Sequence, residues 1–387
     1  MNDVARMVTT AEQLAEVLKE LESAARVALD IESDSFYHYE ERVCLVTISS
    51  ERENFIVDSL ALGEGSRALQ SLVGRQDRPL LMHSANNDVL GLKREYGFEF
   101  GWIQDTALAS TLLNYPQTGL AILAESFLGL HLPKDLQRHD WGQRPITQEH
   151  ISYLINDTRH LFEIHDQISE ELRDHDIYEE YELECKALVQ SVPREREFDP
   201  ERFRRIKNHD GLDASRRGAL KSLYAWRDGV AKALNRAPFR VASDGTLLEL
   251  AKNPPSNLDD LGKRTGVGRW LIAEQGQAIL ESIWKGLAEP APPRAPPKPR
   301  DESDGSKRLD PRQRDILGKL KHWREQEATA RKLGMQTILP TPVMYELLQD
   351  PPADLAAIAA HPRIGKNRAR RYGEALLKLL APLKKPA

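Results

Sequence analysis

Cysteine is scarce in this sequence, with Cys44 and Cys185 the only two among 387 residues. Two thiols are too few for a framework of disulfide bonds or a zinc cluster, so both are expected to be ordinary thiols in a reducing compartment. No stretch reaches the roughly 18 consecutive apolar residues that a membrane-spanning helix requires. Charged and polar residues interrupt the N-terminus, where a signal peptide would need an unbroken apolar run. These features predict a soluble, cytoplasmic protein without membrane contact.

Neither sign of charge dominates the chain, but the two signs are unevenly distributed. The formal net charge is −5, yet residues 1–190 hold 16 basic and 34 acidic residues, which leaves 38 basic and 25 acidic residues for 191–387. A basic half suits a polyanion, because Lys and Arg displace the counterions condensed on phosphates. The alternative is a solvated basic surface. An acidic half that meets the same polyanion needs cations of its own, which points to metal ions.

The length of the chain predicts two or three domains. Short apolar, β-branched runs in the first half predict buried strands, and helical spacing of apolar residues follows them. Strands mixed with helices in this way predict an α/β layered domain over residues 1–190, with a connector to about 212. The predicted strands lie at 26–31, 42–48, 54–58 and 79–83, and the predicted helices at 64–74, 119–130 and 149–172.

The second half lacks strand patterns and contains an internal repeat. A shift of 97 residues, without any gap, places Trp226-Arg227 on Trp323-Arg324 and Gly268 on Gly365. A single offset sustained over this distance predicts two copies of one helical module. We call residues 213–288 the first module and residues 310–387 the second module. The segment 289–309 between them is rich in Pro and charge and is expected to be a semi-rigid linker.

Several carboxylates occupy positions suited to a metal site. Asp30 and Glu32 stand two residues apart near the end of a predicted strand, so both side chains point to one face of the sheet. Asp88 follows the fourth predicted strand, where ligands are common, although a helix N-terminal acid is an equally simple interpretation. Tyr153 and Asp157 stand four residues apart on one face of a predicted helix, a spacing that solvent-facing pairs share. Each signal is weak alone, and the combination is what indicates a site.

Together these segments resemble the DEDD superfamily of 3′-5′ exonucleases, in its tyrosine branch, and within it the ribonuclease D family. The segments LDIESDSFYHYEERVCLVTIS, LLMHSANNDVLGL and YLINDTRHL are similar to the three exonuclease motifs, and Asp105-Thr106 and Asp140-Trp141-Gly-Gln-Arg144-Pro145 to connecting signatures. The two modules resemble HRDC domains. The resemblance implies a ribonuclease H-like domain, with a mixed sheet flanked by helices, followed by two all-α HRDC domains. Ile31 stands where the family usually has Thr.

The resemblance also implies a chemistry for these residues. Asp30 would bridge two divalent ions, Glu32 and Asp157 would complete the site that activates water, and Asp88 would support the second ion. Oxygen-only ligands favour Mg²⁺ or Mn²⁺, and no small-molecule cofactor is expected. Tyr153 would orient water or the scissile phosphate, because its ordinary pKa near 10 makes it a poor base at neutral pH.

The function implied is removal of nucleotides from RNA 3′ ends, with tRNA precursors and other structured RNAs as substrates. Two alternatives stay open from the sequence. One is a 3′-5′ exonuclease acting on DNA, and the other is a nucleic-acid-binding scaffold without catalytic activity.

Cations follow the Gly-containing turn near the end of each module and are expected to contact RNA phosphates. Glycine allows backbone N–H groups to approach a phosphate, and a helix N-terminus adds partial positive charge. The alternative is a solvated basic turn, while Trp226 and Trp323 are expected to be core residues. His83 is expected to be structural. The expected RNA-binding residues are Lys263, Arg264 and Arg269 in the first module and Lys366, Arg368, Arg370 and Arg371 in the second.

Overall fold

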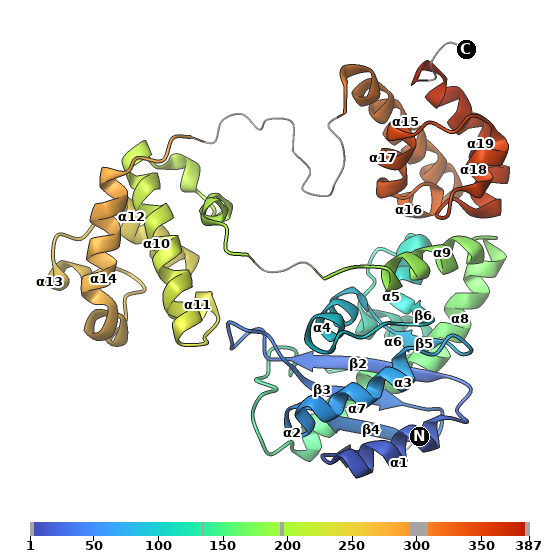
Figure 1. Cartoon of the computed structure of the whole chain (residues 1–387), viewed down its shortest axis with the longest axis horizontal. Helices are drawn as coiled ribbons and strands as arrows, with labels where there is room; N and C mark the ends of the chain where they lie inside the picture. Colours follow the sequence, from blue (N-terminus) through green and yellow to red (C-terminus); the bar gives the residue numbers. More distant parts are fainter. Residues whose placement is uncertain (1–3, 134, 194–196, 294–308, 384–387) are drawn as a thin grey trace. The chain divides into compact units, whose positions relative to one another are not determined.

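The computed structural model describes residues 4–133, 135–193, 197–293 and 309–383 (Figure 1). The chain divides into two compact units. One comprises residues 1–32, 43–193 and 301–387, and the other residues 33–42 and 194–300. Residues 294–308, most of the expected linker, lie outside the described residues. Among the described helices, none is both long enough and apolar enough to cross a membrane.

A six-stranded mixed sheet lies among the helices of residues 4–193 (Figure 1). β1 runs parallel to β4, β3 runs antiparallel to β4, and β5 runs parallel to both β2 and β6. Every residue of β3 and β4 is buried, as their apolar sequences predict. In spatial order the strands are β1 (Ala5–Val8), β4 (Asn54–Asp58), β3 (Val43–Ser49), β2 (Val27–Ser33), β5 (Leu80–Met82) and β6 (Ile103–Asp105).

The four predicted strands are present, and the mixed sheet with helices confirms the predicted fold class. The sequence does not predict β1 and β6, because Arg6 interrupts the short apolar run of β1 and β6 contains a single apolar residue, Ile103. The predicted helix 149–172 is two helices, α7 (Gln148–Arg159) and α8 (Leu161–Asp174), separated at His160. The remaining helices of this part are α1 (Ala11–Leu21), α2 (Ser59–Leu62), η1 (Gly63–Leu69), α3 (Gln70–Val73), α4 (Asn86–Tyr96), α5 (Thr106–Leu112), α6 (Leu120–Leu128) and α9 (Tyr178–Val189).

The second module lies in the same unit as the sheet and has a core of its own around Leu320, Met344 and Leu376. Trp323 packs against this core, as expected. Its helices are α15 (Pro311–Arg331), α16 (Met335–Ile338), α17 (Thr341–Gln349), α18 (Leu355–Ala360), α19 (Gly365–Leu380) and η4 (Ala381–Leu383).

The first module belongs to the other unit and repeats this arrangement. The Arg227 guanidinium donates to the carbonyl oxygen of Ala242 over 2.9 Å, and Arg324 donates to that of Leu339 over 3.0 Å, at positions that the 97-residue shift aligns. The duplication is therefore present in the hydrogen bonds as well as in the sequence. The helices of the first module are α10 (Ala214–Ala233), α11 (Pro238–Val241), α12 (Asp244–Lys252), α13 (Leu258–Leu261) and α14 (Arg269–Ala288), and the short helices η2 (Pro200–Arg205) and η3 (His209–Gly211) precede it.

The buried carboxylate of Asp105 joins the segment after β5 to the segment after β6. It accepts hydrogen bonds from the backbone N–H groups of Ser84 and Ala85, over 3.0 and 2.9 Å, and from those of Ala107 and Leu108, over 2.8 and 3.2 Å. The first pair fixes the turn from which α4 begins, and the second pair caps α5. A single side chain thus sets the position of α4, the helix that carries Asp88.

Replacement of Asp105 is expected to destabilise the chain in a graded way. Asp105→Ala leaves buried N–H groups without acceptors and should lower the free energy of unfolding by about 3 kcal/mol, whereas Asp105→Asn keeps one acceptor oxygen and should cost about half as much. Urea unfolding followed by circular dichroism measures both. Equal losses for the two variants would contradict this role for the carboxylate.

His165 on α8 gives the stability a dependence on pH. Its ring is buried and lies 3.2 Å from the Ser169 hydroxyl, and burial lowers its pKa to about 4. A histidine that is neutral when folded stabilises the fold fully above its unfolded pKa of about 6.5 and loses that contribution as the pH falls towards 4. Between pH 7 and pH 4 the free energy of unfolding, measured by thermal unfolding, should therefore decrease more for the wild type than for His165→Gln, by up to about 3 kcal/mol. Parallel profiles would contradict this assignment.

Candidate active site

Three carboxylates converge at the end of β2. Asp30 and Glu32 extend from β2, Asp157 extends from α7, and one carboxylate oxygen from each lies within 4.8 Å of the others. Asp88, in the first turn of α4, is close enough that its charge affects both Asp30 and Glu32. Residues distant in the sequence, predicted to share a site, are thus brought together from three elements.

The electrostatics of this cluster are unfavourable without a counter-charge. Burial, followed by the charges of Asp88, Asp157 and Glu32, raises the pKa of Asp30 well above its ordinary value. Burial and the same kind of repulsion raise the pKa of Glu32, and burial raises that of Asp157 to about 7. Carboxylates that are desolvated and mutually repelling are retained where a cation can offset the repulsion.

Tyr153 lies beside the carboxylates, one turn before Asp157 on α7. Its side chain is buried, and burial and the neighbouring charges of Asp157, Glu32 and Asp30 raise its pKa above the ordinary value. The phenol therefore stays protonated at neutral pH and can donate a hydrogen bond. Such a group can orient a bound oxygen but cannot act as a base.

The segment that follows Asp140 packs against Tyr153 through Trp141. Trp141 is buried, and its ring centroid lies 5.8 Å from that of Tyr153. Arg144 fixes this segment, because its guanidinium donates to the carbonyl oxygen of Trp141 over 2.8 Å and to both carboxylate oxygens of Asp58 over 2.6 Å each. The arginine keeps the Asp58 pKa below its ordinary value, although burial alone would raise it. The short segment thus acts as a wall of the site.

Two hydroxyl groups hold α7 against the sheet. Ser49 of β3 and Thr158 of α7 lie 2.7 Å apart, and Ser49 also donates to Asn54 over 2.7 Å. Thr158 directly follows Asp157, so this contact fixes the height of the carboxylate above the sheet. His83 Nδ1 lies 2.9 Å from the Thr106 hydroxyl.

The donor set suits hard divalent cations. The converging atoms are carboxylate oxygens, and no histidine or cysteine joins this group among the described residues. Oxygen ligands of this kind prefer Mg²⁺, Mn²⁺ or Ca²⁺ to Zn²⁺. A divalent cation would also remove the repulsion that raises the pKa values of Asp30 and Glu32. The residues present therefore fit a divalent metal site.

Sequence reasoning did not identify the residues that position this site. Asp58, Trp141 and Arg144 support Tyr153, and Asp105 and Ser49 support the helices that carry Asp88 and Asp157. In the sequence, Asp105 and the run at residues 140–145 stand only as connecting signatures of the family resemblance, without a role in positioning the site. The unusual density of Trp, Arg and Pro in this run was the available signal.

The structure separates the predicted RNA-binding cations into two groups. In the first module Lys263 and Arg269 are exposed, and Arg264 lies 3.0 Å from Asp260. In the second module the cations of α19 mostly have carboxylate partners within the chain: Arg368 with Glu184, Arg370 with Asp176, and Arg371 with Asp176 and Glu180.

The chain matches two families of known domains. Residues 5–173 match the 3′-5′ exonuclease domain, and residues 216–283 and 313–380 each match the HRDC domain. These matches cover the sheet with its carboxylates and both copies of the helical repeat.

Individual relatives extend this result. Ribonuclease D from Zymomonas mobilis is 30% identical over 280 residues, which cover 72% of this chain and 71% of that protein. The exosome complex component 10 homolog of Caenorhabditis elegans is 30% identical over 291 residues, but the chain spans only 33% of its length. The crystal structure of Escherichia coli RNase D shares the fold over the whole of both chains, with a TM-score of 0.62 and 22% identity. The chain therefore belongs to the ribonuclease D family of 3′-5′ exoribonucleases, with an exonuclease domain followed by two HRDC domains.

Proposed function

We propose that this chain trims the 3′ ends of structured RNAs, with tRNA precursors among its substrates, by hydrolysis that depends on two Mg²⁺ or Mn²⁺ ions. The observation that carries the proposal is the convergence of Asp30, Glu32 and Asp157 beside Tyr153. Membership in the ribonuclease D family supports RNA as the substrate class. The excess of basic residues in the second half of the chain supports binding of the RNA phosphates away from the 3′ end.

The residues divide the work of hydrolysis among them. Asp30, Glu32, Asp88 and Asp157 would hold the cations, which supply charge neutralisation on the phosphate and an activated water when bound. Asp30 lies at the centre of the mutual repulsion and would be the ligand whose charge the cations offset most. Tyr153, protonated and held by Trp141, donates a hydrogen bond that orients the water or the scissile phosphate. Release of the terminal nucleotide then exposes the next 3′ end.

Asp30→Asn is expected to abolish turnover, with a loss of at least about 1,000-fold in kcat, because a neutral amide is a poor ligand for a shared divalent cation. RNA binding should remain close to wild type, since it is spread over the basic half of the chain. The measurement uses labelled single-stranded RNA and DNA, each with Mg²⁺, Mn²⁺ or chelator. Absence of product from the wild type under every condition would contradict the nuclease assignment, and equal cleavage of DNA would contradict the restriction to RNA.

The same variant should change stability in opposite directions with and without metal. In chelator, Asp30→Asn removes one of four repelling carboxylates and should raise the midpoint of thermal unfolding by a few degrees. With Mn²⁺ in excess the wild type should gain stability by mass action, and the variant should gain much less. Glu16→Gln, at an exposed carboxylate of α1, is the matched control and should show neither effect. A wild-type midpoint that does not respond to Mn²⁺ would refute the metal site.

A further inference from the structure

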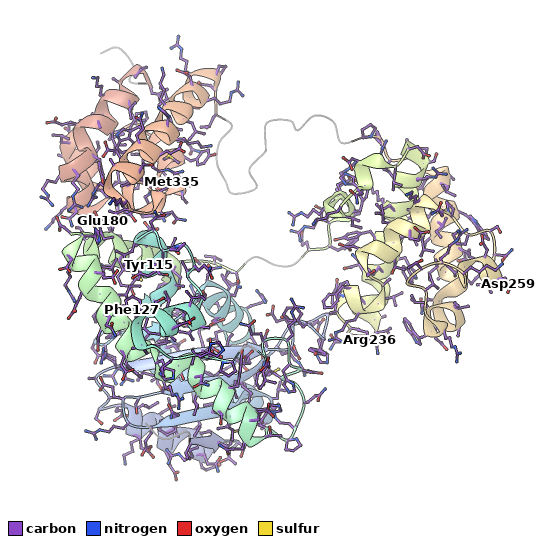
Figure 2. The ribbon with its side chains drawn as sticks, turned by 180° about the vertical axis from the view of Figure 1, so that it is seen from behind. Tyr115, Phe127, Glu180, Arg236, Asp259 and Met335 are labelled. Carbon is purple, nitrogen blue, oxygen red and sulfur yellow. The ribbon has the colours of Figure 1, made fainter. Side chains whose placement is uncertain are left out.

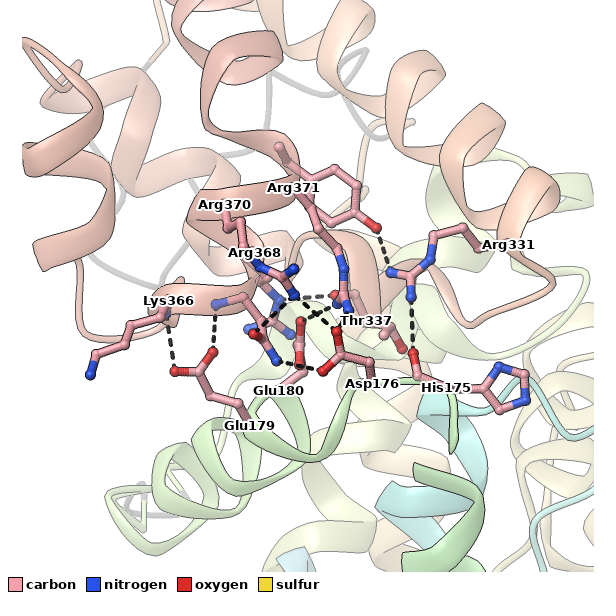
Figure 3. A network of polar contacts seen from close by, with 12 residues as sticks. His175, Asp176, Glu179, Glu180, Arg331, Thr337, Lys366, Arg368, Arg370 and Arg371 are labelled. Atoms are coloured by element: carbon pink, nitrogen blue, oxygen red, sulfur yellow. Dashed lines mark hydrogen bonds and ion pairs between the residues drawn. The ribbon is translucent and has the colours of Figure 1, made fainter. Parts of the chain in front are cut away.

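The second HRDC domain is held to α9 by the cations of its last helix (Figure 3). Helix α9 packs against α5, α8 and β6 of the exonuclease part. Arg368 of α19 is fully buried, and its guanidinium lies 3.4 Å from Glu184. Arg371 pairs with Asp176 and, over 3.2 Å, with Glu180. Figure 2 marks Glu180 of α9 and Met335 of α16 on the two sides of this boundary. Carboxylates of the same chain thus form ion pairs with cations that the sequence predicted to contact RNA.

The start of α19 also binds an anion within the chain. The two carboxylate oxygens of Glu179 accept hydrogen bonds from the backbone N–H groups of Lys366, over 3.0 Å, and Asn367, over 2.6 Å (Figure 3). Backbone N–H groups at a helix N-terminus, together with the helix dipole, are suited to carboxylates and phosphates alike. In the second copy of the repeat, the N-terminus of the last α-helix is therefore a site that binds an anion.

Two glycines show that this boundary is closely packed. A Cβ atom at Gly334 would lie 2.3 Å from the carbonyl oxygen of Thr111, and one at Gly365, whose φ is +75°, would lie 2.6 Å from a methyl group of Leu183. The N–H of Gly334 donates to the carbonyl oxygen of Leu112 over 2.9 Å. A nucleic-acid strand cannot enter between surfaces in such contact.

The 97-residue shift shows what the first HRDC domain has at the same positions. Lys366 and Asn367 correspond to Arg269 and Trp270, so the first copy keeps a cation at the start of the equivalent helix, α14. The docking cations are not kept: in place of Arg368, Arg370 and Arg371 the first copy has Leu271, Ala273 and Glu274. The first copy therefore retains the anion site without the residues that bind α9.

The corresponding face of the first copy is exposed, aromatic and basic. Trp270 and Phe239 are 38% and 51% exposed, although both are large and apolar, and the Phe239 ring also meets that of Phe36 edge to face, with centroids 6.4 Å apart. The exposed Arg236 places its guanidinium 5.8 Å from the Trp270 ring centroid, and Arg269 is exposed beside it. Among the described residues, no side chain caps the N-terminus of α14, where Gly268 is the N-cap. Aromatic rings interleaved with arginines are the combination that binds single-stranded nucleic acid.

We propose that the first HRDC domain binds single-stranded RNA at the start of α14. A phosphate is held by the N–H groups of Arg269 and Trp270 and by the charges of Arg236 and Arg269, while a neighbouring base stacks on Trp270. The second HRDC domain uses the equivalent face to attach itself to α9, so its cations Arg368, Arg370 and Arg371 do not contact RNA. This assignment rests on the proposed ribonuclease function, and it gives the two copies different partners.

The test measures RNA affinity in the full-length chain, in an Asp30→Asn background with chelator to prevent cleavage. Fluorescence anisotropy with a labelled single-stranded oligonucleotide should show a loss of about tenfold for Trp270→Ala, the magnitude of one lost base stack. Arg269→Ala should weaken binding and reduce the slope of log K against log salt by about 1. Lys366→Ala, at the equivalent position of the second copy, is the matched control and should change the affinity less than twofold.

The attachment of the second domain is tested separately by exchanging charges. Arg371→Glu should loosen the domain, detected as faster hydrogen exchange of the Lys366 and Asn367 backbone N–H groups that bind Glu179, and the additional substitution Glu180→Arg should restore their protection. RNA affinity should not follow this pattern, because the pair does not contact RNA.

The outcomes separate this inference from the proposed function. A wild-type chain that neither binds nor cleaves RNA would contradict the proposed function itself. If the wild type binds RNA while Trp270→Ala and Arg269→Ala bind equally well, the α14 site is wrong and the face serves another partner. Equal losses of RNA affinity for Arg269→Ala and Lys366→Ala would show that both copies bind RNA, which would also overturn the inference. Circular dichroism confirms that each variant is folded.

Discussion

The repulsion among Asp30, Glu32, Asp88 and Asp157 is the constraint on which the rest of this structure depends. Carboxylates brought together at a desolvated place cost free energy, and the raised pKa values of Asp30, Glu32 and Asp157 express that cost. A fold can retain such a cluster only if surrounding interactions over-determine the positions of the elements that carry it. The supporting hydrogen bonds of Asp105, Arg144 and Ser49 perform this function. Divalent cations, which the family uses, would convert the repulsion into binding energy.

The supporting interactions share one design, in which a polar side chain joins two segments that are distant in sequence. Asp105 ties the turn before α4 to the start of α5, and Arg144 ties the loop containing Trp141 to Asp58 at the end of β4. The carboxylates of Asp105 and Asp58 and the guanidinium of Arg144 are each paired within the protein, so these ties hold the walls of the site without cross-links. The site is therefore organised before metal or RNA arrives, which reduces the entropy lost on binding.

Much of this could be predicted from the sequence, and the exceptions have physical reasons. The apolar runs of β2 to β5, the i, i+2 spacing of Asp30 and Glu32 and the 97-residue repeat are local or periodic signals, and the structure shows each of them. The strand β6 escaped notice because Ile103-Gln104-Asp105 contains one apolar residue, and its burial is imposed by neighbouring strands. The partners of Arg368 could not be predicted, since pairing with Glu184 depends on how two parts of the chain pack. An arginine that binds phosphate and one that binds a carboxylate look alike in sequence.

The duplicated HRDC domain illustrates how one surface can acquire two partners. The helix N-terminus that receives Glu179 in the second copy is present in the first, where the neighbouring residues are aromatic and basic. The central claim, however, concerns the carboxylates, and the most direct test is a crystal of the chain grown with Mn²⁺ and measured at wavelengths where manganese scatters anomalously. The account predicts two anomalous peaks about 3.5–4 Å apart, bound by Asp30, Glu32, Asp88 and Asp157. Absence of peaks from this cluster would contradict it.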